Sequence, residues 1–253
     1  MKTVSILGCG WLGLPLAEYL LGKGYVVKGS TRTLETLAAL EAAGIEAYYL
    51  SLDPELSGGD GLERFFESDV LVINFPPERR EDIVDFHTAQ IRSLIARIEK
   101  SPIKKVIFVS STSVYPDLGR DVFEDEETPP EKASGKALVI AEKLLLDNPA
   151  FETAVIRFAG LIGYDRKPGR FISGKKGLTG GDSPVNLIHR DDCILIIERI
   201  VEKGIWGEVF NACADLHPKR RDYYTAQALK IGVPPPVFED GGEAGFKIVR
   251  SEK

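Results

Sequence analysis

Cysteine, histidine and methionine are scarce in this sequence. Its 253 residues include three cysteines, three histidines and one methionine. Cys9, Cys193 and Cys213 lie far apart and are odd in number, so their spacing fits neither a metal site nor a disulfide framework. We therefore expect free thiols without a chemical role, no bound metal, and the reducing environment of the cytoplasm.

Long apolar runs and basic clusters are also lacking. No apolar stretch approaches the ~18 residues that a membrane-spanning helix needs. The start, Met1 to Leu7, reaches glycines after a few apolar residues and has no cleavage pattern, so we expect a buried strand there and not a signal peptide. The net charge of −6, without a basic run, argues against a partner with a phosphate backbone. We expect neither nucleic acid nor a membrane as a partner.

The sequence does contain a repeated alternation of short apolar runs and amphipathic stretches. This alternation predicts an α/β fold with a parallel sheet, because parallel neighbours are joined by helical crossovers. The runs are apolar throughout, which is typical of strands covered on both faces. The expected strands are Val4–Leu7, Tyr25–Gly29, Glu46–Leu50, Val70–Asn74, Lys105–Ser110 and Ala154–Phe158. The helices expected between them are Leu12–Leu21, Leu34–Ala43, Glu81–Glu99 and Ala137–Leu146, with Gly24 and Gly44 as left-handed caps.

The pattern changes after Phe158. Residues Gly160 to Pro184 are rich in glycine and basic side chains and are interpreted as a long loop over the site. The elements expected beyond it are strands Val185–Ile188 and Val209–Asn211 and helices Asp191–Glu202 and Arg220–Lys230. We expect a Rossmann-type domain over residues 1–160, with a doubly wound parallel sheet and helices on both faces. Residues 161–253 would form a small, interleaved substrate-binding lobe.

The segment Gly8-Cys9-Gly10-Trp11-Leu12-Gly13 matches the pattern G-x-G-x-x-G. It follows an expected strand and opens an expected helix, the context in which this pattern indicates dinucleotide binding. The first glycine permits a tight turn, the second lets the backbone approach a pyrophosphate, and the third allows close helix–strand packing. N–H groups at the start of the helix then face the phosphates. A plain turn would need one glycine, so we expect a dinucleotide-binding βαβ unit from Met1 to about Arg32.

The end of the second expected strand bears on the choice of cofactor. Sites specific for NAD(H) place a carboxylate there, against the ribose 2′-hydroxyl, but Val27–Arg32 contains no acidic residue. Arg32 can form paired hydrogen bonds with a 2′-phosphate, and Ser30 or Thr31 can donate another. The alternative is that Arg32 is a solvated residue at the start of a helix. The missing acid favours NADP(H) over NAD(H).

Further motifs follow the expected strands in order: Leu52-Asp53, Asn74-Phe75-Pro76-Pro77, Val109-Ser110-Ser111-Thr112-Ser113-Val114-Tyr115, Arg157-Phe158-Ala159-Gly160, Asn186–Asp192 and Val209-Phe210-Asn211. Their order and spacing resemble the NAD(P)-dependent epimerase/dehydratase family, the extended and atypical short-chain dehydrogenase/reductases. The resemblance implies a small-molecule or sugar-nucleotide-like substrate and leaves a homodimer open. By its offset from Tyr115, Ser111 takes the place of the family's catalytic serine. The implied cofactor contacts, beyond the glycine motif and Ser30–Arg32, are Asp53 at the adenine, then Asn74, Phe75, Pro76 and Ser110.

The family's Tyr-x-x-x-Lys pair is missing from the helix where it belongs. In that pair the lysine lowers the pKa of the tyrosine, whose phenol exchanges a proton while a hydride moves to or from nicotinamide. Alignment on Ala141-Glu142 puts Ser134 and Leu138 at the two positions, and a frame that uses Lys136 puts Lys132 at the tyrosine position. The literal match Tyr19–Lys23 lies on the first helix, away from the expected site.

Several residues keep two interpretations. Ser111 either holds a substrate oxygen or satisfies the local backbone. His87 and Asp85 either face the nicotinamide or are ordinary helix residues. The basic residues Arg166, Lys167, Arg170, Lys175 and Lys176 either bind a phosphorylated substrate or are solvated. Two functions follow: an oxidoreductase or epimerase with a degenerate catalytic motif, or a non-catalytic NADP(H)-binding sensor or scaffold.

Overall fold

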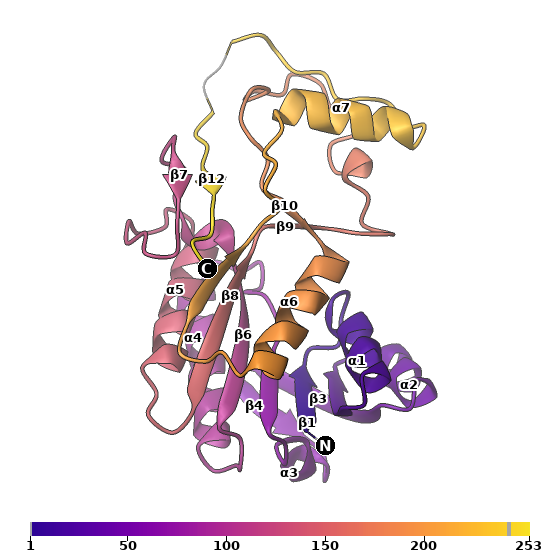
Figure 1. The fold of residues 1–253 in the computed structure, drawn as a ribbon, viewed down its shortest axis with the longest axis vertical. Coiled ribbons are helices and arrows are strands. Elements are labelled where there is room, and N and C mark those ends of the chain that lie inside the picture. Colours follow the sequence, from indigo (N-terminus) through magenta and orange to yellow (C-terminus); the bar gives the residue numbers. More distant parts are fainter. Residues whose placement is uncertain (1, 242–243) are drawn as a thin grey trace. The chain divides into compact units, whose positions relative to one another are not determined.

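The computed structural model describes residues 2–241 and 244–253 (Figure 1). Met1, where the expected βαβ unit begins, lies outside the described residues. The chain forms two compact units and passes between them several times. Unit 1 comprises Met1–Val114, Pro130–Arg157 and Ile194–Phe210, and unit 2 comprises Tyr115–Pro129, Phe158–Cys193 and Asn211–Lys253. This division differs from the one expected at residue 160, because Tyr115–Pro129 belongs to unit 2 and Ile194–Phe210 to unit 1.

The central sheet has the strand order of a doubly wound fold. Its strands are β1 Thr3–Leu7, β2 Val26–Thr31, β3 Glu46–Asp53, β4 Glu55–Gly58, β5 Val70–Ile73, β6 Lys105–Ser111, β8 Glu152–Phe158 and β11 Val209–Ala212. They are arranged in the order β11-β8-β6-β5-β1-β2-β3-β4. The pairs β1–β2, β2–β3, β1–β5 and β5–β6 are parallel, and β3–β4 is antiparallel. The predicted parallel α/β sheet is confirmed, and β4 is an edge strand that the sequence patterns did not predict.

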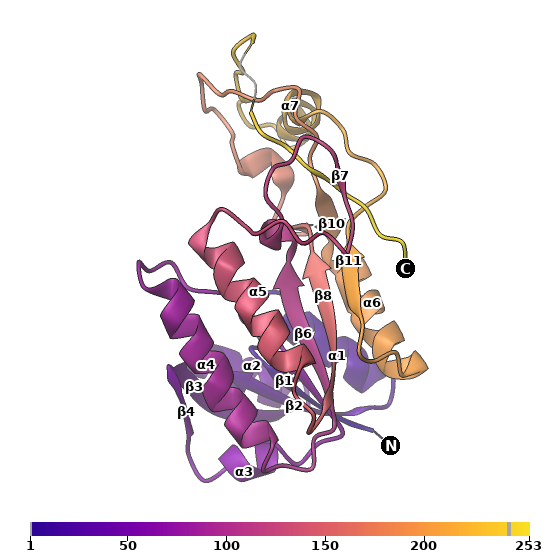
Figure 2. The same cartoon turned by 90° about the vertical axis from the view of Figure 1, so that its left-hand side faces the viewer.

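Helices cover both faces of this sheet. They are α1 Gly13–Gly22, α2 Leu34–Ala42, α3 Leu62–Phe65, α4 Ile83–Ile98, α5 Ala133–Leu146 and α6 Arg190–Lys203. The chain winds from β1 to β3 towards one edge and from β5 to β8 towards the other. Because such crossovers are right-handed, the two directions of winding put their helices on opposite faces. Figure 2 shows α4 and α5 on one side of the sheet and α1 and α6 on the other.

The core of unit 1 lies between the sheet and these helices. All four residues of β5 are buried, and α4 buries Ile83, Phe86, Ile91, Leu94 and Ile98, which their helical spacing places on one face. Gly24 and Gly44 follow α1 and α2 with φ values of 87° and 77°, as expected for left-handed caps. β2 continues to Thr31, past the predicted end at Gly29, so the strand carries the chain to the residue before Arg32.

Unit 2 contains short elements: β7 Asp121–Val122, β9 Gly160–Ile162, β10 Leu187–His189, β12 Ile248–Val249, a 3-10 turn at Pro168–Arg170 and α7 Arg220–Lys230. The interpretation of Gly160–Pro184 as one long loop was wrong in part. Its first residues form β9, which pairs in parallel with β10, Gly160 opposite Leu187. A strand this short depends on its partner for its hydrogen bonds, and composition alone does not reveal that partner. The helix predicted at Arg220–Lys230 has those bounds in the structure.

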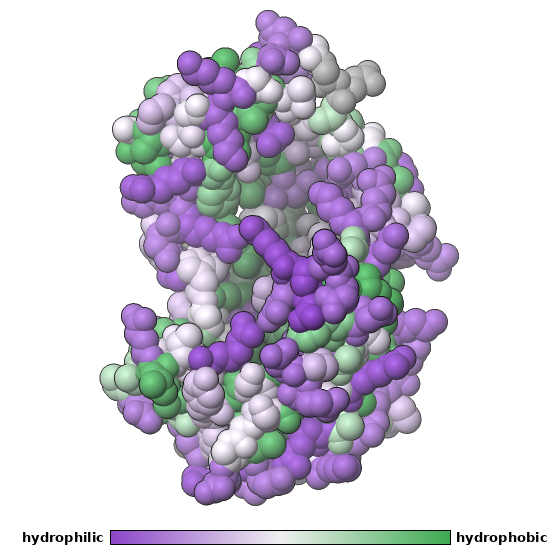
Figure 3. Space-filling model, turned by 180° about the vertical axis from the view of Figure 1, so that it is seen from behind, coloured by the Kyte–Doolittle hydropathy of each residue, from purple (hydrophilic) through white to green (hydrophobic). Residues whose placement is uncertain are grey.

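The face seen in Figure 3 is mainly hydrophilic, with hydrophobic side chains in separate small groups. Within residues 2–241 and 244–253, no helix has the length and apolarity required to cross a bilayer. In the same ranges, no group of three or more His, Cys, Asp or Glu residues is arranged to hold a metal ion.

Candidate functional site

A pocket in unit 1 opens where the winding of the sheet reverses. β1 continues into α1 on one face, whereas its neighbour β5 leads to α4 on the other. Helices that diverge in this way leave a crevice outside the carboxyl ends of the two strands, the usual ligand site of open α/β sheets. The pocket is lined from β1 by Leu7, from β2 by Ser30 and from the segment after β5 by Asn74.

The three glycines of the loop after β1 meet three different requirements. Gly8 has a φ of 103°, and a Cβ there would lie 2.3 Å from the Asn74 carbonyl oxygen. A Cβ on Gly13 would lie 2.3 Å from the Gly8 carbonyl oxygen, so only glycine lets α1 start this close to the loop. A Cβ on Gly10 would meet nothing within 4 Å. Gly10 lines the pocket and, having no side chain, leaves the space before α1 open.

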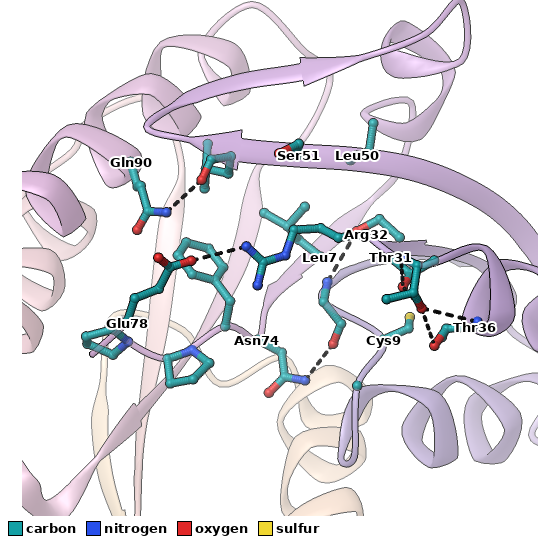
Figure 4. Close-up of a pocket in the computed structure, with 18 residues that line it drawn as sticks. Leu7, Cys9, Thr31, Arg32, Thr36, Leu50, Ser51, Asn74, Glu78 and Gln90 are labelled. Carbon is teal, nitrogen blue, oxygen red and sulfur yellow. Dashed lines mark hydrogen bonds and ion pairs between the residues drawn. The ribbon is translucent and has the colours of Figure 1, made fainter. Parts of the chain in front are cut away.

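Hydrogen bonds from both neighbouring strands hold this loop (Figure 4). The Gly8 N–H donates to Ser30 Oγ at 3.2 Å, and the Cys9 N–H donates to the Ser30 carbonyl at 2.8 Å. On the other side, Asn74 Nδ2 donates to the Gly8 carbonyl at 2.9 Å. Ser30 is buried, so its hydroxyl serves the loop, and the expected donation to a 2′-phosphate would have to be made in addition. Burial raises the pKa of the Cys9 thiol to about 12, which keeps this thiol protonated and inert.

A charged pair stands at the exposed side of the pocket. Arg32 Nη1 lies 3.1 Å from Glu78 Oε1, and both residues line the pocket (Figure 4). Glu78 comes from the segment after β5, next to Pro77. The start of α2 lies on the same side, where the Thr33 side chain accepts a hydrogen bond from the Thr36 N–H at 3.3 Å. Thr33, Thr36 and Glu78 were not expected in the site.

The wall opposite the glycine loop is formed by β3 and α4. Leu50, Ser51 and Leu52 line it, whereas Asp53, the residue expected at the adenine, is exposed and is not a lining residue. Gln90 from α4 also lines the pocket and donates from Nε2 to the Leu52 carbonyl at 2.7 Å. This bond fixes the end of β3 against α4. In the sequence, the signal for this bond is a glutamine on the apolar face of the helix, one turn after His87.

His87 supports Gln90 from behind. The His87 ring is fully buried, packs edge-on against Phe75, and places Nδ1 3.1 Å from Gln90 Oε1. Because Gln90 Nε2 is committed to Leu52, its Oε1 must accept, and the neutral histidine carries its proton on Nδ1. Burial lowers the pKa of His87. The interpretation of His87 as a core residue is the one that this environment supports, and Asp85 is exposed on the same helix.

The pocket brings together eight of the expected cofactor residues: Gly8, Gly10, Ser30, Thr31, Arg32, Asn74, Phe75 and Pro76. Trp11, Leu12 and Gly13 lead from the loop into α1 without lining the pocket. Ser110 is buried and donates to Glu142 Oε1 at 2.5 Å. Glu142 also forms an ion pair with Arg157 Nη2 at 2.7 Å. Ser110 therefore belongs to a buried polar cluster between β6, α5 and β8.

Ser111 and α5 hold the remaining candidate residues. The Ser111 hydroxyl accepts a hydrogen bond from the Ser113 N–H at 3.2 Å, which is the local bond that the backbone interpretation predicts. α5 carries no tyrosine; Leu138 is buried on it and Lys136 is exposed. On α1, Lys23 Nζ lies 5.3 Å from the Tyr19 ring centroid, at the end of the helix remote from the glycine loop.

Comparison with known proteins identifies relatives over nearly the whole chain. No protein-family model matches the sequence. Protein YeeZ of Escherichia coli, in strains K12 and O157:H7, is 36% identical over 246 residues, which is 97% of this chain and 89% of YeeZ. This chain belongs to the YeeZ family.

Solved structures share the fold at lower identity. dTDP-glucose 4,6-dehydratase from Bacillus anthracis, in complex with NAD, is 20% identical with a TM-score of 0.78, covering 100% of this chain and 88% of that one. A short-chain dehydrogenase/reductase superfamily protein from Agrobacterium tumefaciens with bound NAD is 17% identical with a TM-score of 0.76, covering 98% and 88%. This member of the YeeZ family thus has the fold of the epimerase/dehydratase and short-chain dehydrogenase/reductase proteins, as its motifs predicted.

The candidate residues of unit 2 are placed within that unit alone. His189 ends β10, and its Nδ1 accepts a hydrogen bond from the Asp191 N–H at 3.3 Å, a local bond at the start of α6. The Tyr115 hydroxyl, buried, donates to Asn211 Oδ1 at 2.7 Å. The five basic residues expected around the Gly160–Pro184 segment are all exposed: Arg166, Lys167, Arg170, Lys175 and Lys176.

Proposed function

We propose that the protein binds NADP(H) in the unit 1 pocket, in preference to NAD(H), and acts as an oxidoreductase or epimerase. Its substrate is a small molecule or a sugar-nucleotide-like compound, and unit 2 is the substrate lobe. The observation that carries the proposal is the open space at Gly10, between a glycine loop held from both sides and the start of α1. The NAD complexes of the two solved neighbours support a nicotinamide dinucleotide as the cofactor. The preference for NADP(H) rests on Arg32 and on the missing acid at the end of β2.

The residues present fit a dinucleotide. N–H groups at the start of α1 suit a pyrophosphate, since a helix amino end carries positive partial charge and unpaired donors. Arg32 and the start of α2 suit a 2′-phosphate for the same electrostatic reason. Leu50, Leu52 and Phe75 supply apolar surface for a base or ribose. When bound, the cofactor supplies or accepts a hydride at its nicotinamide ring.

The pocket is tested with Gly10→Ala. The new methyl group has free space and Gly10 has no positive φ, so the variant folds with wild-type stability. The methyl group projects into the space proposed for the pyrophosphate, so calorimetric titration with NADPH should show binding weakened by ~100-fold or more, as expected for a lost charge-assisted contact and a steric clash. Gly22→Ala, which also meets nothing within 4 Å, is the matched control and should bind normally. Unchanged NADPH affinity in Gly10→Ala would refute the proposed site.

A second function is favoured by one observation. α5 offers neither tyrosine nor a paired lysine, so the protein could bind NADP(H) as a sensor or scaffold without catalysis. The two functions are separated by single-turnover assays of NADPH oxidation and NADP⁺ reduction with carbonyl compounds and sugar nucleotides. Turnover that Ser111→Ala reduces supports the enzyme, and saturating NADPH binding without turnover supports the sensor. A cytoplasmic location and a homodimer belong to both versions of this proposal.

A further inference from the structure

The carboxylate that β2 lacks is supplied in space by another strand's loop. Sites that select NAD(H) carry an acid at the end of the second strand. Here β2 ends at Thr31 without an acid, and Arg32 follows it. Glu78, 46 residues further along the chain, places Oε1 3.1 Å from Arg32 Nη1. The pocket therefore holds, side by side, a guanidinium suited to a 2′-phosphate and a carboxylate suited to a 2′-hydroxyl (Figure 4).

The two side chains differ in how firmly they are placed. Glu78 follows Pro76 and Pro77, whose rings fix their own φ angles and restrict the residue before each of them. The guanidinium of Arg32 lies at the end of a long side chain that is 64% exposed, whereas the side chain of Glu78 is 40% exposed. An exposed ion pair contributes up to about a fivefold factor to an equilibrium. Arg32 can therefore leave Glu78 at little cost when a stronger anion arrives.

We infer that Glu78 determines cofactor specificity by competing with the 2′-phosphate for Arg32. The inference rests on the proposed function. With NAD(H), Arg32 stays paired with Glu78, whose carboxylate accepts a hydrogen bond from the ribose hydroxyl. With NADP(H), Arg32 transfers to the phosphate, and Glu78 is left as a negative charge beside a dianion. The pair admits both cofactors and restrains the preference that Arg32 alone would give.

Glu78→Gln tests this by removing the charge at constant shape. Titration calorimetry with NADPH and with NADH measures both dissociation constants. NADPH should bind about tenfold more tightly, because Arg32 is released and a repulsive charge is lost. NADH should bind about two- to threefold more weakly, because a neutral amide oxygen is a poorer acceptor than a carboxylate. Asp147→Asn, at the exposed end of α5, neutralises one acid outside the pocket and should leave both constants unchanged.

The same substitution in an Arg32→Ala background identifies the mechanism. If Glu78 acts through Arg32, the gain in NADPH affinity should fall from about tenfold to about twofold, the part due to direct repulsion. An equal gain in both backgrounds, or an unchanged NADPH-to-NADH ratio in Glu78→Gln, overturns the inference while leaving dinucleotide binding intact. Failure of the wild type to bind either cofactor overturns the proposed function itself.

Discussion

The side-chain amide of Asn74 donates from Nδ2 to the main-chain carbonyl of Gly8 at 2.9 Å. This bond joins the ends of β1 and β5, the two strands between which the sheet reverses its winding. The Gly8 N–H is bonded to Ser30 on the other side at 3.2 Å, so the loop is held between β2 and β5 before any ligand arrives. Such preorganisation lowers the entropy lost when a ligand binds.

Asn74→Ala should therefore weaken NADPH binding more than it lowers stability. Loss of one hydrogen bond is expected to reduce the free energy of unfolding by about 1 kcal/mol. The dissociation constant should rise about tenfold, because the entropy lost when the loop at Gly8 becomes ordered then opposes binding. Calorimetric titration and urea denaturation measure the two quantities. Asn148→Ala, which removes an exposed amide bonded to Glu99 at 2.8 Å, is the control for stability without an effect on binding.

The elements of this site that the sequence predicted are those specified locally. The glycine pattern requires its own backbone geometry, so Gly8, Gly10 and Gly13 could be assigned roles from spacing alone. Glu78 could not be found in this way, because its contact with Arg32 depends on the path of the chain after β5. Asp53, expected to contact the adenine, lies one residue beyond the lining residue Leu52, at the exposed end of β3, so its contact stays a prediction.

Removing one partner of the buried ion pair between Glu142 and Arg157 should destabilise the protein far more than replacing both partners. Their side chains are only 4% and 11% exposed, and Ser110 donates to the same carboxylate. Arg157→Met leaves a buried charge without its partner and should reduce the free energy of unfolding by about 3–5 kcal/mol. The double variant Glu142→Leu/Arg157→Met should recover most of that loss. Lys105→Met removes the cation of a more exposed pair with Glu152 and should cost less than about 1 kcal/mol.

If the double variant is no more stable than Arg157→Met, the loss of stability comes from the missing bonds of the polar cluster and not from an unpaired buried charge. Those bonds would then be what holds α5 to the sheet. This distinction concerns α5, the helix on which the expected Tyr-x-x-x-Lys pair is missing in both alignment frames. The sequence could not predict the pair, because the contact between Glu142 and Arg157 depends on how α5 packs against β8.

His87 should make the protein sensitive to mild acid. Burial lowers the pKa of the ring, and the bond to Gln90 and the nearby Glu78 carboxylate offset this only in part. The unfolded chain takes up a proton near pH ~6.5 while the folded ring stays neutral. Stability is therefore constant above that pH and falls as the pH drops towards the lowered value. Urea denaturation of wild type and His87→Phe at pH 7.5, 6.5 and 5.5 (chosen to span about one unit on either side of the free-histidine value) should show a smaller loss in the variant.

His87→Phe should also be less stable at neutral pH, by about 1–2 kcal/mol, because Gln90 Oε1 loses its donor. His189→Phe, a change at a partly exposed histidine of unit 2, is the comparison. An acid response that is identical in wild type and His87→Phe would assign the effect to other groups, among them His217, whose pKa is also lowered by burial.

Asn186 should hold the carboxyl-terminal segment of unit 2 in place. Its Nδ2 donates to the Lys247 carbonyl at 2.9 Å, and its Oδ1 accepts from the Val249 N–H at 2.9 Å, so one side chain pairs with an extended backbone as a neighbouring strand would. Asn186→Ala removes both bonds, each worth about 0.5–1.5 kcal/mol. Local opening should then speed hydrogen exchange at residues 247–250 by about tenfold, while exchange in β5 of unit 1 stays unchanged. Equal exchange in wild type and variant would mean that the pairing of β12 with β7 is sufficient to hold this segment.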